Sequence, residues 1–504
     1  MRNLLFILII FISNELSSQI ANDSLRNNFW IMGYGAYPNS EIYHTFFDFR
    51  GDTLRIDSMI VPGSLYMAYT NASICDTAGN LLFFSNGCGV MDSGFQYVPG
   101  AEHINDGETQ NYLCTEIGGG RYPNSLLILP DTSGKVYNLI HSRVNNLSAV
   151  GISSDHLFWT QIISNVDGQL STVFADSIVL DTFLYLGNMS ACRHANGRDW
   201  WVVAPAYSNE ITTGLDNSYY VLRLAQDNIS IHKNSIGVAT DKFENSTGEA
   251  VFSPDGTKYA RYTIHADLQI FDFDRCTGTF SYPVHVPIVD AADTSYAAGL
   301  AFSPSGRYLY VSSTQYIYQV DMQAVDILAS KTTVAVYDGF YYPIPQSTNR
   351  FYQCELGPDG KIYVSCPGGK YTFHVIEHPD SAGLACQVVQ HKYILDYPIF
   401  GGLPHFPNFR LGALPGGACP SVSSVEVVEE GAGVRVYPNP AKSILYMTSN
   451  VPNRYRIYNM LGAAILEGQL EEQITVLDIS QLQSGVYIMS VDGGLRPVKF
   501  IVSH

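Results

Sequence analysis

From Trp30 onward, short stretches rich in Val, Ile, Tyr and Phe alternate with clusters of Gly, Asn, Asp and Pro. No long stretch shows the 3.6-residue period of an amphipathic helix, so the pattern predicts strands. The chain is therefore predicted to be an all-β protein. The 34 tyrosines fit a pleated, half-buried surface. A carbohydrate-binding platform of aromatic side chains is the alternative interpretation of the same tyrosines.

One hairpin pattern recurs six times along the chain. In each copy, two apolar runs flank a tight turn in which glycine can take the positive φ that reverses the chain, and in the three clearest copies proline presets φ. The copies lie roughly 50 to 63 residues apart, and a repeat of that length built only from strands predicts β-propeller blades. The hairpins span residues 72–84, 125–140, 189–203, 249–260, 299–310 and 353–364.

The number of blades depends on the two ends of residues 27–411, the predicted propeller. Three strand-like runs precede the first hairpin, at residues 29–33, 42–49 and 53–60, and residues 402–409 form one isolated run after the last. We expect both ends to build a seventh blade together, because such closure removes exposed sheet edges. Six blades remain the alternative.

The composition changes at residues 412–430, where Gly, Ala, Pro and Ser indicate a flexible linker. Short strands then resume with a different spacing, which predicts a small Ig-like β-sandwich over residues 431–504. The predicted strands are residues 434–437, 444–448, 455–459, 464–469, 474–478 and 485–491, with a further short run at 499–502.

The first residues have the layout of a secretory signal peptide, predicted to span residues 1–18. Arg2 precedes an apolar run from Leu4 to Ile12, which as a helix would be about 14 Å long against a hydrocarbon core of about 30 Å. We expect this segment to be cleaved. No later run reaches ~20 apolar residues, so no transmembrane anchor is expected after its removal.

Charge and cysteine content exclude some classes of partner and site. The net charge of −18 argues against a nucleic-acid partner, which requires clustered Lys and Arg. All nine cysteines follow the signal peptide, so disulfides are expected, and the odd number leaves at least one thiol without an intramolecular partner. Their connectivity is open. No C-x-x-C or mixed Cys/His cluster is present, so zinc is not expected.

An ordered series of motifs resembles the type A C-terminal sorting domain of the type IX secretion system of Bacteroidota. The resemblance implies recognition by the secretion machinery, passage through the periplasm, and release from the cell or attachment to the outer-membrane surface. Release and attachment both remain open. The residues that carry the resemblance are Tyr437, Pro438, Asn439, Pro440, Gly462, Leu482, Gly485, Tyr487 and Lys499.

The body of the chain resembles exported TolB-like and WD-repeat-like propellers of the same phylum. The matching residues are 30–33, 72–87, 194–200, the proline-containing turns and Gly402-Leu403-Pro404. The sequence departs from the pattern at His405 and Pro407. This resemblance implies a fold and a location, and no particular reaction.

Catalytic and metal-binding motifs are not found. The sequence has no G-x-S-x-G, H-E-x-x-H or G-x-x-x-x-G-K-[ST] motif. His374 and His378 would lie about 13 Å apart if residues 371–376 form a strand, too far to share one ion. Asp272 and Asp274 alternate with phenylalanines as the polar side of a strand would, and calcium needs several more oxygens. No catalytic residue, metal or cofactor is therefore predicted, and calcium lacks support.

His194 is the one candidate for the axial channel of the propeller. It precedes the Asn196-Gly197 turn and the Trp200-Trp201 pair. A buried histidine that is hydrogen-bonded to a neighbouring blade is the other interpretation of the same residue.

Two functions are compatible with the predicted exported propeller. The first is a non-catalytic surface module that binds a protein or a glycan. The alternative is an extracellular hydrolase or lyase with its site at the mouth of the channel.

Overall fold

A computed structural model describes most of the chain after residue 22. The described residues are 23–35, 41–120, 122–147, 151–206, 215–225, 228–241, 248–264, 266–288, 299–343, 346–414, 419, 435–437, 441, 443–449, 453–459, 463–470, 473–491 and 498–502. The chain divides into two compact units, Met1–Pro420 and Ser421–His504. The boundaries predicted at residues 27, 411 and 431 remain predictions. The signal peptide and most of the linker lie outside the described residues.

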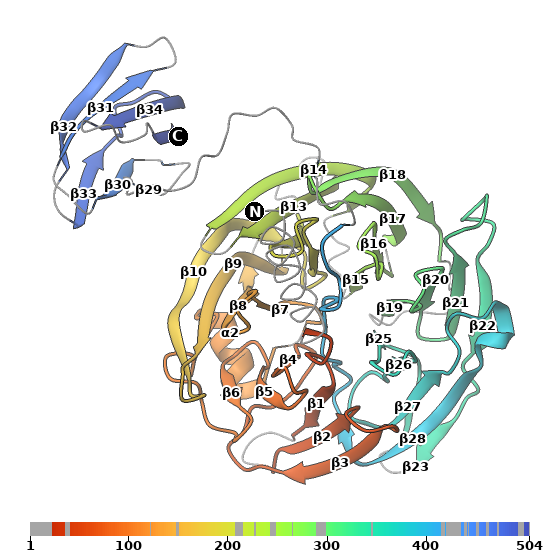
Figure 1. Ribbon diagram of the computed structural model, residues 1–504. Coiled ribbons are helices and arrows are strands. Elements are labelled where there is room, and N and C mark those ends of the chain that lie inside the picture. The colour runs from red at the N-terminus through yellow and green to blue at the C-terminus, as the bar shows by residue number, and fades with distance from the viewer. Residues whose placement is uncertain are drawn as a thin grey trace, which may run out of the picture. The chain divides into compact units, whose positions relative to one another are not determined.

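In the described part of the first unit, seven antiparallel sheets of three or four strands are set around a common centre (Figure 1), which confirms the predicted all-β propeller with seven blades. In every sheet the strands follow one another in chain order. Two blades have three strands: blade 1 with β1 (Phe29–Tyr34), β2 (Tyr43–Asp48) and β3 (Arg55–Ile60), and blade 2 with β4 (Ala72–Cys75), β5 (Leu81–Ser85) and β6 (Val90–Asp92).

The other five blades have four strands each. Blade 3 holds β7 (Leu126–Pro130), β8 (Val136–Leu147), β9 (Gly151–Ser164) and β10 (Leu170–Leu184). Blade 4 holds β11 (Ser190–Arg193), β12 (Trp200–Pro205), β13 (Leu215–Ala225) and β14 (Asn228–Asp241). Blade 5 holds β15 (Gly248–Phe252), β16 (Lys258–Thr263), β17 (Asp267–Asp274) and β18 (Thr279–Val286).

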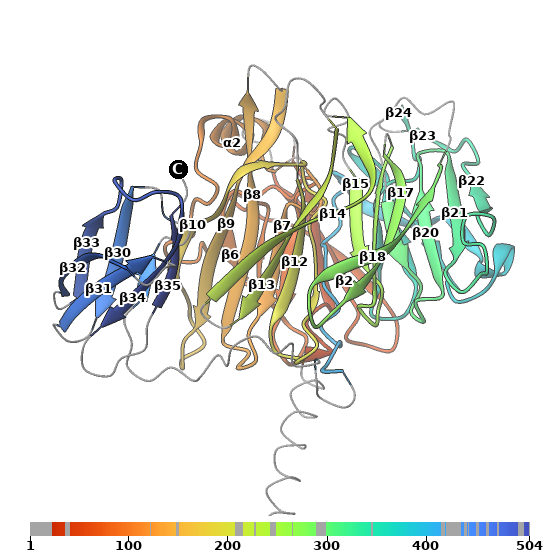
Figure 2. The same ribbon diagram turned by 90° about the horizontal axis from the view of Figure 1, so that it is seen from above.

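Blade 6 holds β19 (Gly299–Phe302), β20 (Tyr308–Ser312), β21 (Tyr316–Asp321) and β22 (Thr332–Val336). Blade 7 holds β25 (Cys354–Leu356), β26 (Ile362–Val364), β27 (Lys370–Ile376) and β28 (Val388–Ile399), with a 3-10 turn, η2 (Gly383–Cys386), before β28. A separate hairpin, β23 (Tyr341–Pro343) and β24 (Gln346–Thr348), joins blades 6 and 7. Figure 2 shows this hairpin at the same end of the blades as the short helix α2 (Glu108–Tyr112).

The six predicted hairpins are the first two strands of blades 2 to 7. Each turn contains a glycine whose N–H bonds to the main-chain oxygen three residues earlier. All six glycines have a positive φ of 67° to 84°, which glycine adopts without steric cost. They are Gly79, Gly134, Gly197, Gly256, Gly306 and Gly360.

Closure of the ring differs in one respect from the predicted joint blade. Residues 400–414, here called the axial tail, run antiparallel to β1 and cross the middle of the ring (Figure 1). The N–H of Phe400 donates to the main-chain oxygen of Gly33 at 3.0 Å, and the ring of Phe406 contacts Trp30. The tail therefore lies beside blade 1 as predicted. Residues 402–409, however, form no strand.

The composition of the tail explains why no ladder forms. Pro404 and Pro407 have no N–H to donate. The side-chain amide of Asn71 instead donates to the main-chain oxygens of Ile31 at 2.8 Å and Gly402 at 3.4 Å. A side-chain bridge from blade 2 thus replaces the missing ladder between the tail and blade 1.

The rest of the tail crosses to blades 4 and 5. The Asn408 amide donates to the main-chain oxygen of Pro254 at 2.7 Å, and the N–H of Leu414 donates to Ala195 at 2.9 Å. A disulfide joins Cys276, which follows β17, to Cys419 beyond the tail. The tail is therefore fixed at both of its ends.

The N-terminal residues of the propeller also fold over the ring. Asp23 accepts from Arg26 at 3.1 Å and from Arg193 of blade 4 at 3.0 Å. Arg26 also donates to the main-chain oxygen of Cys75 in blade 2 at 3.1 Å. The start of the propeller thus ties blades 2 and 4 together.

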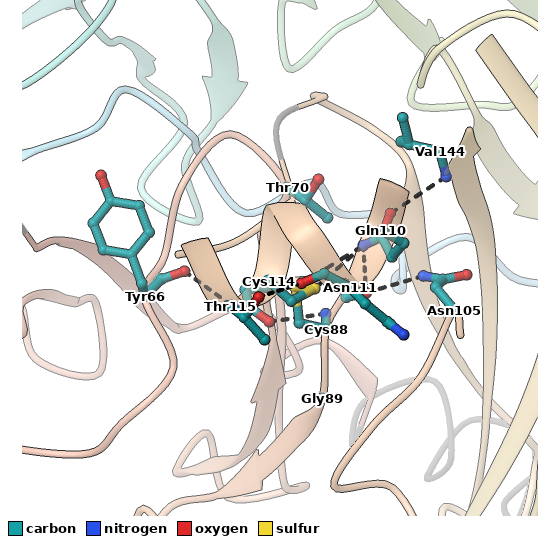
Figure 3. The surroundings of a disulfide bond; sticks show 12 residues. Tyr66, Thr70, Cys88, Gly89, Asn105, Gln110, Asn111, Cys114, Thr115 and Val144 are labelled. Carbon is teal, nitrogen blue, oxygen red and sulfur yellow. Dashed lines mark hydrogen bonds between the residues drawn. A yellow bond between two sulfur atoms is a disulfide. The ribbon is translucent and has the colours of Figure 1, made fainter. Parts of the chain in front are cut away.

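A second disulfide, Cys88–Cys114, braces the outer part of blade 2 (Figure 3). Cys114 lies in a π-helical turn, η1 (Leu113–Ile117), that continues α2. Beside the disulfide, the Gln110 side chain donates to the main-chain oxygen of Gly87 at 3.2 Å and accepts from the N–H of Val144 in β8 at 3.3 Å. This segment therefore links blade 2 to blade 3.

The remaining five cysteines are free and buried, in agreement with the expectation of at least one free thiol. Burial raises the pKa of all five thiols, so they stay protonated at neutral pH. They are Cys75, Cys192, Cys354, Cys366 and Cys386.

Large aromatic side chains fill the seam between blades 1 and 7. The rings of Trp30 and Phe47 contact Tyr363, with centroids 5.5 and 5.7 Å away, and Phe47 also packs on Phe373 at 4.9 Å. All four side chains are fully buried. Packing of this kind contributes hydrophobic stabilisation in proportion to the buried area.

The second unit is a seven-stranded sandwich, described here by itself. One sheet has the order β29-β30-β33 and the other β32-β31-β34-β35, and the strands match the predicted runs. Buried Leu445, Ile457, Met489 and Phe500 form its centre. The strands are β29 (Arg435–Tyr437), β30 (Ile444–Ser449), β31 (Asn453–Asn459), β32 (Ala464–Leu470), β33 (Gln473–Asp478), β34 (Gly485–Val491) and β35 (Val498–Val502).

Within the part of the chain that the structure describes, no helix has both the length and the apolar character needed to cross a membrane.

Substitution Gly402→Ala tests the close approach of the tail. A Cβ at this position would collide with the main-chain oxygen of Ala68, which has no room to move. We expect the free energy of unfolding to fall by about 2–4 kcal/mol, measured by denaturant titration with tryptophan fluorescence. Gly51→Ala is the control, because a Cβ there meets nothing closer than 3.8 Å. Equal stability of the two variants would show that the tail does not pack as described.

Candidate functional site

A cavity of about 310 Å³ lies at one end of the axial channel. Its wall combines the first strands of blades 4 to 7, the turns that follow three of them, and residues 405–410 of the axial tail. Most of the lining is apolar. The polar and charged side chains in the wall are Asn27, Ser190, Glu355, His405, Asn408 and Arg410.

The repeated turns build the rim of this cavity. Pro254, Pro304 and Pro358 occupy the same position in the turns of blades 5, 6 and 7, and all three line the cavity. Proline fixes φ, and the glycine two residues later reverses the chain. The local chemistry that makes the hairpins therefore also makes a rigid rim.

Glu355 is the only carboxyl among the residues that line the cavity. It lies in β25 and is 9% exposed. Burial raises the pKa of Glu355 well above its ordinary value, although the N–H groups of Phe406 and Leu356 oppose the rise. The rise favours the neutral acid, which can donate one hydrogen bond.

His405 of the axial tail stands beside this acid. Its Nδ1 lies 3.7 Å from Oε2 of Glu355, which is longer than a hydrogen bond. Burial lowers the pKa of His405 to about 4, so its ring is neutral near pH 7 and no ion pair forms. The main chain of Met189 lies near the ring, but neither ring nitrogen makes a hydrogen bond of ordinary geometry within the described structure.

A second buried acid, Glu249 of β15, joins three blades. Its Oε2 accepts from the N–H of Leu300 in blade 6 at 2.6 Å and from that of Cys354 in blade 7 at 3.2 Å. Its Oε1 accepts from the side-chain amide of Gln353 at 3.2 Å, and Gln353 accepts from Leu403 of the tail at 3.0 Å. Burial raises the pKa of Glu249 well above its ordinary value. Both oxygens are thus used in blade-to-blade bonds.

The repeat explains how Glu249 reaches so far. Glu249, Gly299 and Gln353 occupy the same position in three successive repeats, five residues before the turn proline. A Cβ at Gly299 would collide with the main-chain oxygen of Tyr352. The glycine in blade 6 therefore leaves the space through which the carboxyl of blade 5 contacts blade 7.

His194 lies in the turn between β11 and β12 and is not among the residues that line the cavity. Its Nδ1 accepts from the N–H of Asn196 at 3.0 Å, and its ring packs on Trp201 with centroids 5.4 Å apart. Burial, with Arg223 nearby, lowers the pKa of His194. The structure places this residue between blades 4 and 5, where Arg275 donates to its main-chain oxygen at 3.4 Å.

The sequence pattern predicts neither Glu355 nor His405 as a site residue. One signal could have indicated Glu355: the same position is occupied by Val251 and Ala301 in the two preceding repeats, so an acid stands where the repeat is apolar. His405 departs from the resembling propellers, but its place beside Glu355 depends on the path of the tail. That path is set by long-range contacts.

The described residues hold no group of three or more His, Cys, Asp or Glu side chains placed to bind a metal ion. Strand β27 (Lys370–Ile376) contains the strand predicted over residues 371–376, and His374 is buried within it. Asp272 and Asp274 lie on β17 between buried phenylalanines, as the alternation predicts.

Five of the nine sorting-motif residues are described, two of them by their main chain only. Buried Leu482 belongs to the core of the sandwich, and Tyr487 stacks on Phe500 with centroids 5.6 Å apart. A Cβ at Gly485 would meet nothing closer than 3.9 Å. Tyr437 ends β29 and Lys499 lies in β35. The four that lie outside the described residues are Pro438, Asn439, Pro440 and Gly462.

Residues 435–503 match the family model of the secretion system C-terminal sorting domain. This match confirms the sorting domain of the type IX system that the motifs resemble, and it implies a secreted or cell-surface protein that interacts with the secretion machinery. Among curated proteins, none matches the sequence.

Several solved structures are similar to the chain at low identity. Sqt1 of Saccharomyces cerevisiae is 9% identical with a TM-score of 0.38, over 74% of this chain and 88% of that one. XC5397 of Xanthomonas campestris, described as a gluconolactonase, is 11% identical with a TM-score of 0.31, over 66% and 92%.

PorZ of Porphyromonas gingivalis, described as an essential surface component of the type IX secretion system, is 11% identical with a TM-score of 0.29, over 94% and 70%. Likenesses this distant carry no argument about function.

The raised pKa of Glu355 predicts a pH dependence of stability. A carboxyl whose pKa is higher in the folded state than in the unfolded state stabilises the fold most at a pH below its unfolded-state pKa. This stabilisation is lost as the pH rises through the folded-state pKa. Relative to Glu355→Gln, the wild-type free energy of unfolding should therefore fall above about pH 5, by up to ~1.4 kcal/mol per pH unit. Denaturant titrations between about pH 5 and 8 measure this difference.

The exposed carboxyl of Glu108 provides the control for this experiment. Glu108→Gln should follow the wild-type profile. Parallel profiles for Glu355→Gln and wild type would mean that Glu355 is ionised in the folded protein.

Proposed function

We propose that this chain is a surface-displayed binding module, exported by the type IX system, whose propeller holds a protein or glycan ligand in the axial cavity without catalysis. The cavity is of a size to take one protein side chain or one sugar residue. Its wall is mostly apolar with a few fixed polar groups, the composition common in binding pockets.

The observation that carries this proposal is the set of unpartnered polar atoms in the wall. Oδ1 of Asn27 is buried without a hydrogen-bond partner among the described residues, and the ring nitrogens of His405 have only the main chain of Met189 nearby, with no hydrogen bond of ordinary geometry. A buried polar atom left without a partner costs roughly 1–3 kcal/mol. A ligand that supplies those hydrogen bonds would offset this cost, so the wall favours an occupied cavity.

The same residues weigh against the hydrolase or lyase alternative. Hydrolysis of a glycosidic bond normally uses two carboxyl groups that face the substrate. The described lining contains one, Glu355, while both oxygens of Glu249 are engaged by the N–H groups of blades 6 and 7. These contacts support binding over turnover.

Substitution His405→Ala tests the proposal directly. A glycan array and a pull-down with the purified exported chain identify a ligand, and calorimetry then measures its affinity. We expect His405→Ala to weaken binding at least tenfold, or about 1.4 kcal/mol, because the ring nitrogens no longer contact the ligand. Glu355→Gln keeps the shape of the acid and should weaken binding less, while Glu108→Gln should leave it unchanged.

Two results would contradict this function. Unchanged affinity in both cavity variants would place the ligand elsewhere on the molecule. Conversion of the bound ligand to a new product, lost in Glu355→Gln, would support the enzyme alternative.

A further inference from the structure

Five tyrosines gather at the seam of blades 1 and 7, at the end of the blades opposite the cavity. This tyrosine face is formed by Tyr34, Tyr43, Tyr342, Tyr371 and Tyr397. β1 begins next to Asn27 of the cavity wall and ends at Tyr34, which places the cluster at the far end. Figure 2 shows the β23–β24 hairpin, which carries Tyr342, at this end of the blades.

Four rings of this face stack in two pairs, while the ring of Tyr34 packs on Tyr66 and Phe400. Tyr43 stacks on Tyr397 with ring centroids 4.5 Å apart, and Tyr342 stacks on Tyr371 at 5.2 Å. Tyr34 lies directly opposite Tyr43 in the pairing of β1 with β2, and the pairing of β27 with β28 places Tyr371 near the end of β28 that carries Tyr397. Five phenols from three separate parts of the chain are therefore gathered at this seam.

Two glycines leave space for these rings. A Cβ at Gly369 would lie 2.6 Å from Cε2 of Tyr34, and a Cβ at Gly35 would lie 2.9 Å from Cδ2 of Tyr66, the ring on which Tyr34 packs. Neither glycine has a positive φ, so their backbone could accept other residues. The small size of these glycines therefore leaves room for the rings of Tyr34 and Tyr66.

The exposure of the cluster sets it apart from the core aromatics. Trp30 and Tyr363 are fully buried, whereas all five tyrosines of the face are only partly buried, and the adjacent Tyr341 is 52% exposed. A partly buried tyrosine offers an apolar ring and a hydroxyl edge to the same ligand. Such side chains are enriched where proteins bind other molecules.

The charges around the tyrosine face indicate which ligand it fits. Glu41 accepts from the hydroxyl of Tyr43 at 3.2 Å, and Asp396 is exposed next to Tyr397. Acidic neighbours and a chain of net charge −18 disfavour an anionic ligand. Carboxylates accept hydrogen bonds from hydroxyl groups, phenols both accept and donate them, and aromatic faces attract polarised C–H groups. Neutral sugars carry both hydroxyl groups and polarised C–H groups.

We infer that the tyrosine face is a second binding site, separate from the cavity, and that it takes a neutral glycan chain. Sugar rings pack with their C–H faces on the tyrosines, and their hydroxyls bond to the phenols and to Glu41. The inference deepens the proposed function by naming a ligand class, but it uses residues on the opposite end of the propeller.

Calorimetric titration of the full exported chain tests this site. The probes are neutral hexasaccharides of glucose, xylose and mannose, with hexagalacturonate as the anionic comparison. We expect at least one neutral hexasaccharide to bind, and Tyr371→Ala to weaken that binding at least tenfold. Gly369→Ala keeps all five tyrosines but displaces Tyr34, and should weaken binding about threefold or more. Tyr282→Ala, at an isolated tyrosine 78% exposed on β18, should bind as wild type.

Several results would overturn the inference. These are the absence of saturable binding to any neutral hexasaccharide, binding of hexagalacturonate alone, or equal affinity of Tyr371→Ala and wild type. Loss of hexasaccharide binding in His405→Ala but not in Tyr371→Ala would also overturn it, while leaving the cavity proposal intact. A protein ligand lost in Tyr371→Ala, with no hexasaccharide bound, would show that the face binds protein instead.

Discussion

The side-chain amide of Asn71 donates to the main chain of blade 1 and to that of the axial tail, and so joins the first blade, the second blade and the end of the propeller. In a ring of blades the first strand of each sheet is an edge that faces the centre, and the tail lies along this edge at blade 1. The prolines of the tail prevent an ordinary ladder at that edge. Side-chain amides supply the hydrogen bonds instead, from Asn71 on one side and from Gln353 on the other.

The same closure creates the cavity. His405 and Asn408 reach the wall only because the tail crosses the channel after it leaves blade 1. The network from Glu249 through Gln353 to Leu403 connects the tail to blades 5, 6 and 7, and the Cys276–Cys419 disulfide fixes its far end. The element that holds the ring together is therefore also the element that shapes the candidate site.

Much of the fold could be predicted because its signals are local. The turn glycines at positions such as Gly256 and Gly306 have the positive φ that the sequence indicates. The strands of the sorting domain follow from short apolar runs between turn residues. Seven blades were preferred because three runs precede the first hairpin, and the structure has those three strands as β1 to β3.

The site could not be predicted because its parts are far apart in the sequence. Glu355 and His405 meet only after the tail has crossed the ring, and no local pattern encodes that path. His194 stood out through its neighbours, yet its contacts with Asn196 and Trp201 lie between two blades. The tail is held beside blade 1 by the side chain of Asn71 and not by a strand ladder. Asn71 is more than 300 residues away from the tail along the chain, so no local pattern predicts this contact.

Native-state hydrogen exchange of the tail amides is the most direct measurement of this closure. Phe400 and Leu403 both donate from the main chain to buried acceptors. If the tail closes the ring, these two amides should exchange only on global unfolding, with the same free energy as the amides of β15 and β16. Exchange of Phe400 and Leu403 by local opening, while β15 and β16 stay protected, would contradict the account.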